Sequence, residues 1–159
     1  KDITLEQVEE AVNLTREVGL QTIGYFMIGS PGETPETISR TIGFAKRLKL
    51  DFAQFAVAVP FPGTKLYELY LKNGGENVPW ENFVYEGTGN RVTPLFETSA
   101  LSRTDLRLWA SMAYKEFYLR PSYLWQQIRR ISSPGDLRVS LQGLSLLIKN
   151  IRPAKKDRE

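Results

Sequence analysis

Two stretches of the sequence share one layout, in which an apolar run stops at a sharp turn that contains a Pro-Gly pair. The first stretch is "YFMIGSPGET" (25–34) and the second is "FAVAVPFPGTKLYE" (55–68). Thr34 and Pro35, which follow the first turn, suit the cap and the first position of a helix. The layout therefore predicts a buried strand, a turn and a helix, twice in succession.

Helical spacing of apolar residues precedes, separates and follows the two runs. Strands joined by single amphipathic helices form parallel sheets through right-handed crossovers. Ligands gather at the C-terminal ends of such strands, so both turns should lie side by side on one rim. The stretch "LQTIGYFMIG" (20–29) is too apolar for a strand that is buried on one side only, which predicts that both of its faces are covered. The expected elements are a helix from Thr4 to Gly19, strands within "LQTIGYFMIG" (20–29) and "DFAQFAVAVPF" (51–61), a helix from Pro35 to Leu48 between them, and a short helix that ends near Gly74.

The pattern weakens after the third helix and becomes helical again near residue 101. Ser102 and Asp105 make a capping box ahead of an apolar stripe, Pro121 restarts the helix, and another helix is expected from Ser133. We therefore predict four regions: an α/β unit at 1–76, a connecting hairpin or loop at 77–100, a helical region at 101–152 and a disordered tail at 153–159.

The chain of 159 residues contains neither cysteine nor histidine. This composition excludes disulfides, thiol nucleophiles, imidazole bases and most transition-metal sites. No apolar run reaches the roughly 18 residues of a membrane span, and Lys1 is interpreted as a cut end. Residues 120–159 carry nine Lys or Arg against three Asp or Glu. Such a tail fits either solvated helix faces or contact with nucleic acid, an anionic membrane or an acidic partner.

The turns allow two interpretations of Glu33. Glycine at 29 and 32 lets the backbone approach a ligand closely, because no Cβ intervenes. Glu33 is then either a capping residue stabilised by the helix dipole, or a carboxylate at the mouth of a cleft that accepts hydrogen bonds from a ligand. In the second turn, Pro60 and Pro62 either stiffen the chain or shape a pocket wall.

The combination of "IGSPGET" and "PFPGT" resembles the later part of the catalytic barrel of radical S-adenosylmethionine (SAM) enzymes. More narrowly, residues 1–72 are similar to members with an N-terminal cobalamin-binding domain, the group that includes the anaerobic magnesium-protoporphyrin monomethyl ester cyclases. The helical stretch "LSRTDLRLWASMAYKEFYLRPSYL" continues the likeness more loosely. The resemblance implies an α/β fold, in which 1–76 is the C-terminal half of a partial (β/α) TIM-like barrel, followed by a C-terminal helical region. It makes 22–28 the fifth strand and 53–59 the sixth.

The resemblance also implies where SAM would lie. The turn after the fifth strand helps to hold SAM in the family, which implies that Ile28 and Gly29 pack near the nucleoside and that Glu33 fixes the turn or contacts the ligand. The end of the sixth strand lies by the adenine. The implied cofactor-binding residues are Ile28, Gly29, Gly32, Glu33, Val57, Ala58 and Pro60. No catalytic residue and no metal ligand is expected in this chain.

The family holds a [4Fe–4S] cluster through three cysteines, and this chain has none. We therefore expect a fragment of a longer enzyme, which holds no cofactor and is inactive by itself. The parent is expected to act in the cytoplasm with SAM, a [4Fe–4S] cluster and, as a further candidate, cobalamin, in the radical oxidation, cyclisation or methylation of a large hydrophobic substrate.

The expected partners are the missing N-terminal half of the same polypeptide, that small-molecule substrate and a second copy of the chain. The second copy would bind through the edge of the strand at 22–28, which has lost its barrel neighbour. The C-terminal helices or a hairpin at 82–96 are the other candidates for covering this edge.

Two other functions remain open. A non-catalytic binding or scaffold domain would keep half a barrel without its chemistry. A third candidate is a basic amphipathic module for membranes or nucleic acid, made by Tyr123, Trp125 and Ile128 beside Arg129 and Arg130. Aromatic residues at helical spacing are more typical of a core, so neither nucleic-acid binding nor membrane contact is expected.

Overall fold

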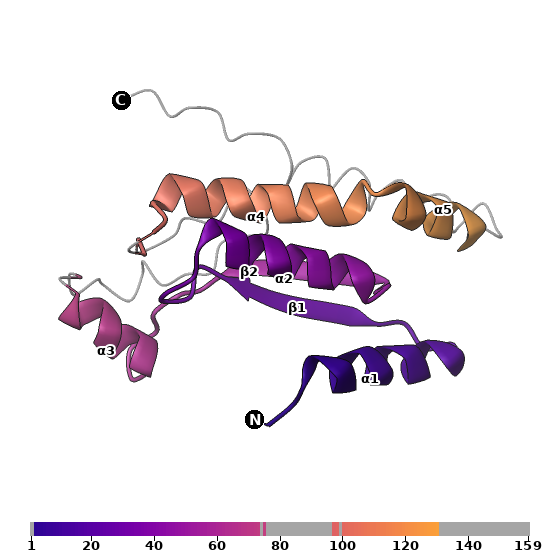
Figure 1. The fold of residues 1–159 in the computed structure, drawn as a ribbon, viewed down its shortest axis with the longest axis horizontal. Helices are drawn as coiled ribbons and strands as arrows, with labels where there is room; N and C mark the ends of the chain where they lie inside the picture. The colour runs from indigo at the N-terminus through magenta and orange to yellow at the C-terminus, as the bar shows by residue number, and fades with distance from the viewer. Residues whose placement is uncertain (1, 74, 76–96, 99, 131–159) are drawn as a thin grey trace.

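The computed structural model describes residues 2–73, 75, 97–98 and 100–130 of the chain. Within this part the protein is a mixed α/β structure, with five helices and a two-stranded parallel sheet (Figure 1). The predicted α/β class is confirmed. None of these helices has the length and apolar composition that a membrane span needs. The elements are α1 (Leu5–Glu17), β1 (Ile23–Ile28), α2 (Pro35–Arg47), β2 (Phe52–Val57), α3 (Lys65–Lys72), α4 (Arg103–Tyr118) and α5 (Pro121–Arg130).

The helix boundaries follow from the residues at their ends. The Thr4 hydroxyl accepts a hydrogen bond from the N–H of Gln7, and the Gln7 side chain accepts one from the N–H of Thr4. This capping box begins α1, and similar boxes begin α2 at Thr34 and α4 at Ser102. Gly19 follows α1 with φ 76°, a left-handed conformation that ends helices. These predicted starts and this predicted stop are confirmed.

The two strands pair in parallel over their whole length, with Ile23 opposite Phe52 and Ile28 opposite Val57. Just beyond the strands, the N–H of Ala58 donates to the carbonyl of Ile28 at 2.8 Å. Because parallel strands run in the same direction, the turns that follow them lie at the same end of the sheet. The predicted shared rim is confirmed.

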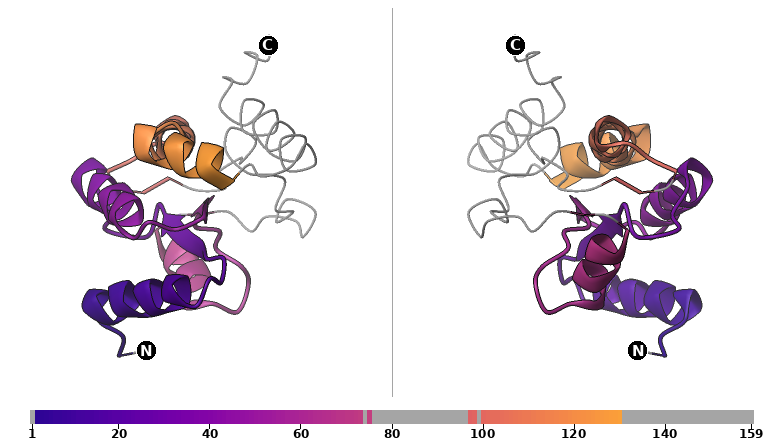
Figure 2. Two further views of the ribbon diagram at one scale, coloured as in Figure 1. Left: turned by 90° about the vertical axis from the view of Figure 1, so that its right-hand side faces the viewer. Right: turned by 90° about the vertical axis from the view of Figure 1, so that its left-hand side faces the viewer.

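One face of the sheet is covered by helices. Alternate side chains of a strand point to the same face, and on this face Ala53, Phe55 and Val57 are at most 3% exposed. α2 packs against β1, and α4 packs against both β2 and α2. Figure 2 shows α2 beside the sheet and α4 on the β2 side of it. The rings of Phe26 and Phe55 stack at 5.2 Å within this shared core, which Phe117 of α4 joins.

The opposite face of the sheet is largely exposed. Its side chains, which we call the open face, are those of Ile23, Tyr25, Met27, Phe52, Gln54 and Ala56. Tyr25 is 72% exposed and Met27 is 61% exposed. The prediction that both faces of strand 22–28 are covered is therefore wrong. Side chains on both faces of this strand are apolar, which is why the sequence predicts burial of both. The described residues, however, cover only one face.

At the end of the sheet away from the rim, Asp51 joins the start of β2 to β1 and to α5. Its carboxylate accepts hydrogen bonds from the N–H of Thr22 at 2.7 Å and from the side-chain amide of Gln126 at 3.0 Å. Asp51 is 1% exposed, and such bonds offset the cost of burying a carboxylate. The far end of the sheet is therefore held by the protein's own polar groups.

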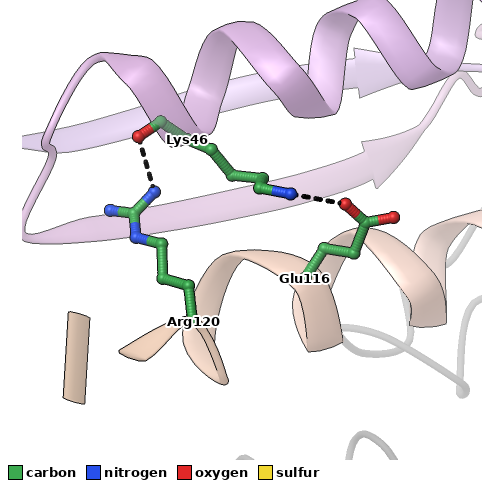
Figure 3. A network of polar contacts seen from close by, with 3 residues as sticks. All are labelled: Lys46, Glu116 and Arg120. Atoms are coloured by element: carbon green, nitrogen blue, oxygen red, sulfur yellow. Dashed lines mark hydrogen bonds and ion pairs between the residues drawn. The ribbon is translucent and has the colours of Figure 1, made fainter. Parts of the chain in front are cut away.

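Polar contacts also hold α4 against α2 (Figure 3). The Lys46 ammonium and the Glu116 carboxylate lie 2.8 Å apart, with side chains 38% and 42% exposed. Arg120 donates to the Lys46 carbonyl at 2.9 Å, near the C-terminal end of α2. Its guanidinium lies 4.2 Å from the centre of the Phe117 ring, and burial lowers the pKa of Arg120. Arg120 thus connects α2 to the end of α4 through both a hydrogen bond and an aromatic contact.

Candidate functional site at the strand ends

The two strand ends carry the same turn. Each turn contains a Pro-Gly pair, Pro31-Gly32 after β1 and Pro62-Gly63 after β2. In each, the N–H of the residue after glycine donates to the carbonyl of the residue before proline, at 3.0 Å and 3.1 Å. The two glycines have φ 79° and φ 82°. Proline followed by a positive-φ glycine inside such a bond is the pattern of a type II turn. The repeated sequence layout therefore encodes two matching turns on one rim.

Glu33 holds the first turn through its side chain. Its Oε2 atom accepts hydrogen bonds from the N–H of Gly29 at 2.5 Å and from the N–H of Ser30 at 3.0 Å. Gly29 has φ 81°, so the carboxylate stabilises a backbone conformation that glycine adopts most readily. The cap of α2 is the next residue, Thr34. The structure therefore shows that Glu33 fixes the turn. Its contact with a ligand stays a prediction.

The rim has a packed inner part and an open outer part. A Cβ atom at Gly29 would lie 2.9 Å from Cδ2 of Leu106 and 3.4 Å from Cγ1 of Val57, so α4 packs directly against the first turn. A Cβ atom at Gly32 or Gly63 would meet no atom within 4 Å. The outer glycines therefore leave free space beside the backbone, where a ligand can approach.

The structure brings all seven predicted binding residues to this rim but buries most of them. The buried ones are Ile28, Gly29, Val57, Ala58 and Pro60. Gly32 is exposed and Glu33 is half-buried. The side chains of Ile28 and Val57 lie on the covered face, where they form part of the core. Their binding roles stay predictions, and Gly32 and Glu33 are the members that the structure leaves accessible.

Sequence reasoning missed the side chains of the open face. Tyr25 lies opposite Gln54, and Met27 lies opposite Ala56. None of the six open-face residues carries a charge. The alternation of side chains along a strand could have predicted this face. Met27 directly precedes Ile28, and Ala56 directly precedes Val57, so each must point to the opposite face from its neighbour.

The residues considered for a membrane or nucleic-acid surface are separated by the structure. Tyr123 is 7% exposed, and its ring lies 5.1 Å from that of Tyr118, so it belongs to the core. Trp125 and Ile128 are 60% and 59% exposed, and the Arg129 guanidinium lies 5.6 Å from the Trp125 ring. The expectation that this surface contacts neither a membrane nor nucleic acid stays a prediction.

The chemistry of the rim suits binding. The chain contains no cysteine, so its residues do not fit a [4Fe–4S] cluster, which is held by thiolates. The exposed turn backbone and the uncharged open face fit a ligand that has polar edges and an apolar body. At the start of α2, a hydrogen bond with the Thr34 side chain lowers the pKa of Glu36. A carboxylate therefore stays ionised where the helix dipole favours negative charge.

Comparison with known proteins finds homologues, although no family model matches the chain. An uncharacterized methyltransferase of Pyrococcus horikoshii is 35% identical over 129 residues, which are 80% of this chain. The anaerobic magnesium-protoporphyrin IX monomethyl ester cyclase of Rubrivivax gelatinosus is 30% identical over 124 residues, or 78% of this chain. The cyclase of Cereibacter sphaeroides is 29% identical over 129 residues, or 79% of this chain.

These matches cover most of this chain but a small part of each relative. The chain spans 27% of the methyltransferase and 21% and 20% of the two cyclases. The homologues include the cyclases to which the sequence motifs pointed, so that part of the resemblance is confirmed. A cobalamin-binding domain is not shown, and the activity of the whole protein does not follow from the match alone.

Proposed function

We propose that these residues form the last two βα units of the catalytic barrel of a radical SAM enzyme, either a methyltransferase or an oxidative cyclase. The observation that carries the proposal is the shared rim, where two adjacent parallel strands end in matching Pro-Gly turns beside a largely exposed, uncharged face. The homologues named as a methyltransferase and as cyclases support it.

The open face supports an inward orientation of the two strands. In a (β/α) barrel the helices surround the outside and the inward side chains of the strands line the interior. Here α2 covers one face of the sheet, so the open face would be the barrel interior. Its uncharged residues suit a large hydrophobic substrate, such as the porphyrin in the cyclases' name.

In this proposal the residues of the chain bind and orient. The rim, through 29–33 and 58–63, would hold SAM, with Glu33 keeping the first turn in place. The [4Fe–4S] cluster would be held by cysteines elsewhere in the same polypeptide, since this chain has none. Cobalamin is a further candidate cofactor, and the chain alone is proposed to be inactive.

The coding sequence upstream of Lys1 provides a first test. We expect it to continue in frame and to encode a C-x3-C-x2-C motif, because the cluster needs three thiolates from the same chain. An upstream sequence without cysteines would contradict the proposal and favour the non-catalytic scaffold.

The activity test uses the complete polypeptide, purified without oxygen and supplied with iron, sulfide, SAM and dithionite. We expect SAM to be consumed, with 5′-deoxyadenosine or S-adenosylhomocysteine as the product. The matched control is the same polypeptide with the three motif cysteines changed to alanine. SAM consumption no faster than in this control would overturn the proposed function.

A further inference from the structure

α4 carries the same residue spacing on two opposite sides. Its core side is lined by fully buried residues at intervals of four, three and four, which are Leu106, Ala110, Ala113 and Phe117. The same intervals recur two residues later in a second set, which we call the outer seam: Leu108, Met112, Lys115 and the C-cap Leu119. A shift of two residues is about 200° around a helix. The three apolar members of the outer seam are 58%, 41% and 48% exposed, so this seam faces away from the core.

Hydrogen bonds to β2 fix which side of α4 faces outward. The Tyr118 hydroxyl accepts a hydrogen bond from the N–H of Ala53 at 3.0 Å and donates one to the carbonyl of Ala53 at 2.8 Å. The Tyr114 hydroxyl makes the same pair of bonds with Phe55, at 3.2 Å and 3.3 Å. Because two hydroxyls about one helical turn apart hold two strand residues, α4 cannot turn its outer seam toward the sheet.

The spacing of the outer seam fits a helix as its partner. Side chains at alternating intervals of four and three residues form the line along which two helices interlock. The four positions of the outer seam span only about 60° of the helix circumference, at about 100° per residue. A helix that buries a whole face shows an apolar stripe of about 100° or more, whereas a narrower stripe is typical of helix pairing. The buried side of α4 is wider, since it also includes Ser111 and Tyr114.

The charges at the outer seam indicate the chemistry of that helix. Lys115 is exposed at the third seam position, so a docked helix needs a carboxylate opposite it to avoid burying an unpaired ammonium group. Asp105 and Glu116 border the seam, where Asp105 accepts a hydrogen bond from Ser102 and Glu116 pairs with Lys46. These bordering carboxylates would repel an anionic lipid surface or a nucleic acid. The charges therefore favour a protein partner.

A second copy of α4 fits the outer seam poorly. In a parallel pair, Lys115 of one copy would face Lys115 of the other. In an antiparallel pair, in which Leu108 faces Leu119, the two lysines would lie within about one helical turn of each other. Like charges at this spacing repel, so the seam selects a partner of different sequence.

α5 extends the surface beyond the outer seam. Figure 1 shows α5 following α4 end to end. Tyr123 is 7% exposed, whereas Trp125 and Ile128, on the other side of α5, are 60% and 59% exposed. The Arg129 guanidinium lies 5.6 Å from the Trp125 ring, and α5 contains no acidic residue. Tryptophan is among the residues that contribute most to binding at protein interfaces, and Arg129 adds a second positive charge for a partner to meet.

We propose that the outer seam, together with Trp125, binds one helix of another protein. That helix is amphipathic, presents apolar side chains at intervals of four and three residues, and places carboxylates opposite Lys115 and Arg129. The proposal goes beyond the proposed function and does not depend on it, because it concerns the side of α4 that faces away from the sheet.

Fluorescence anisotropy with two designed helical peptides tests the proposal on the complete polypeptide. Both labelled peptides carry leucines at intervals of four and three residues. One has a glutamate, and the other a lysine, in the middle of its leucine seam. We expect the glutamate peptide to bind about tenfold more tightly, because like charges across an interface lower the affinity. Equal affinities of the two peptides would overturn the proposal.

Variants of the outer seam locate the binding. Lys115→Glu should reverse the preference, so that the lysine peptide binds more tightly, a gain that a misfolded variant cannot produce. Met112→Glu should weaken the binding of the glutamate peptide by about tenfold. The matched control is Leu14→Glu, which changes a similarly exposed leucine of α1 and should leave the affinity unchanged. An unchanged preference in Lys115→Glu would show that the peptides do not bind at the seam.

Three other occupants of the outer seam would give different results. Self-association in sedimentation that Met112→Glu abolishes would assign the seam to a second copy. Binding to phosphatidylglycerol vesicles that Met112→Glu abolishes would assign it to a membrane. An affinity for the glutamate peptide that rises when residues 131–159 are removed would assign it to the chain's own C-terminal residues. Each of these results would overturn the proposal.

Discussion

At the scale of single residues, the two glycines of the first turn have similar backbone angles but different surroundings. Gly29 has φ 81° and Gly32 has φ 79°. An added Cβ would contact Leu106 at 2.9 Å in the first case and nothing within 4 Å in the second. Substitution of Gly32 would therefore cause backbone strain alone, whereas substitution of Gly29 would add a steric clash with Leu106.

We expect Gly32→Ala to lower the free energy of unfolding by about 1–2 kcal/mol, the cost of a left-handed alanine. Gly29→Ala should add about 1–3 kcal/mol to that cost, because its methyl group enters a packed contact with α4. Urea denaturation of both variants measures the difference. Equal losses would mean that α4 does not pack against the turn.

Tyr118 gives a prediction about alkaline pH. Burial raises the pKa of Tyr118 above its ordinary value of 10.0. Above pH 10 the unfolded chain therefore loses this proton before the folded chain does, and the free energy of unfolding falls as the pH rises. Below pH 10 the contribution is fully present. We expect the fall between pH 10 and 11 to be shallower in Tyr118→Phe. Identical slopes in urea denaturation would contradict the burial of this hydroxyl.

At the scale of elements, α2 and α4 are joined by one exposed ion pair and one partly buried arginine. Glu116→Gln breaks the exposed pair with Lys46 and should change the free energy of unfolding by less than about 0.5 kcal/mol. Arg120→Met keeps most of the side-chain stem but loses the charged donor to the Lys46 carbonyl, which should cost about 1.5–3 kcal/mol. Urea denaturation of the two variants tests this order. A larger loss of unfolding free energy in Glu116→Gln than in Arg120→Met would contradict this order.

The elements divide into those that local sequence determines and those that it does not. The caps at Thr4, Thr34 and Ser102 were predictable because both partners lie within three residues of each other. The hydrogen bonds of α4 to β2 were not predictable, because Tyr114 and Tyr118 lie 59 and 65 residues from their partners Phe55 and Ala53. Only the packing of α4 decides which of its faces meets the strand.

The candidate site, too, was predictable where it depends on nearby residues and not where it depends on packing between distant ones. The rim was predictable, since two apolar runs, each followed by Pro-Gly, place both turns at the ends of parallel strands. The burial of Ile28 and Val57 required knowing which face α2 and α4 cover. The hydrogen bond between the Gly29 N–H and the Glu33 carboxylate depends on the left-handed backbone at Gly29, which cannot be read from the sequence.

At the scale of the whole molecule, the described residues form a one-sided structure. Helices cover one face of the sheet, α4 closes one edge, the open face is largely exposed, and no described strand pairs with the edge of β1. A two-stranded sheet is small for independent stability, and here it shares a core with α2 and α4. This asymmetry is what the last units of a barrel would show next to the part that completes it.

The most direct measurement is photoaffinity labelling of the complete polypeptide with an azidoadenosyl analogue of SAM, followed by tryptic mapping. The two strand ends fall in the tryptic peptides 17–40 and 50–65. We predict that the label enters at least one of these peptides and that unlabelled SAM displaces it. Displaceable label found only outside both peptides would show that the rim of Pro-Gly turns does not hold SAM.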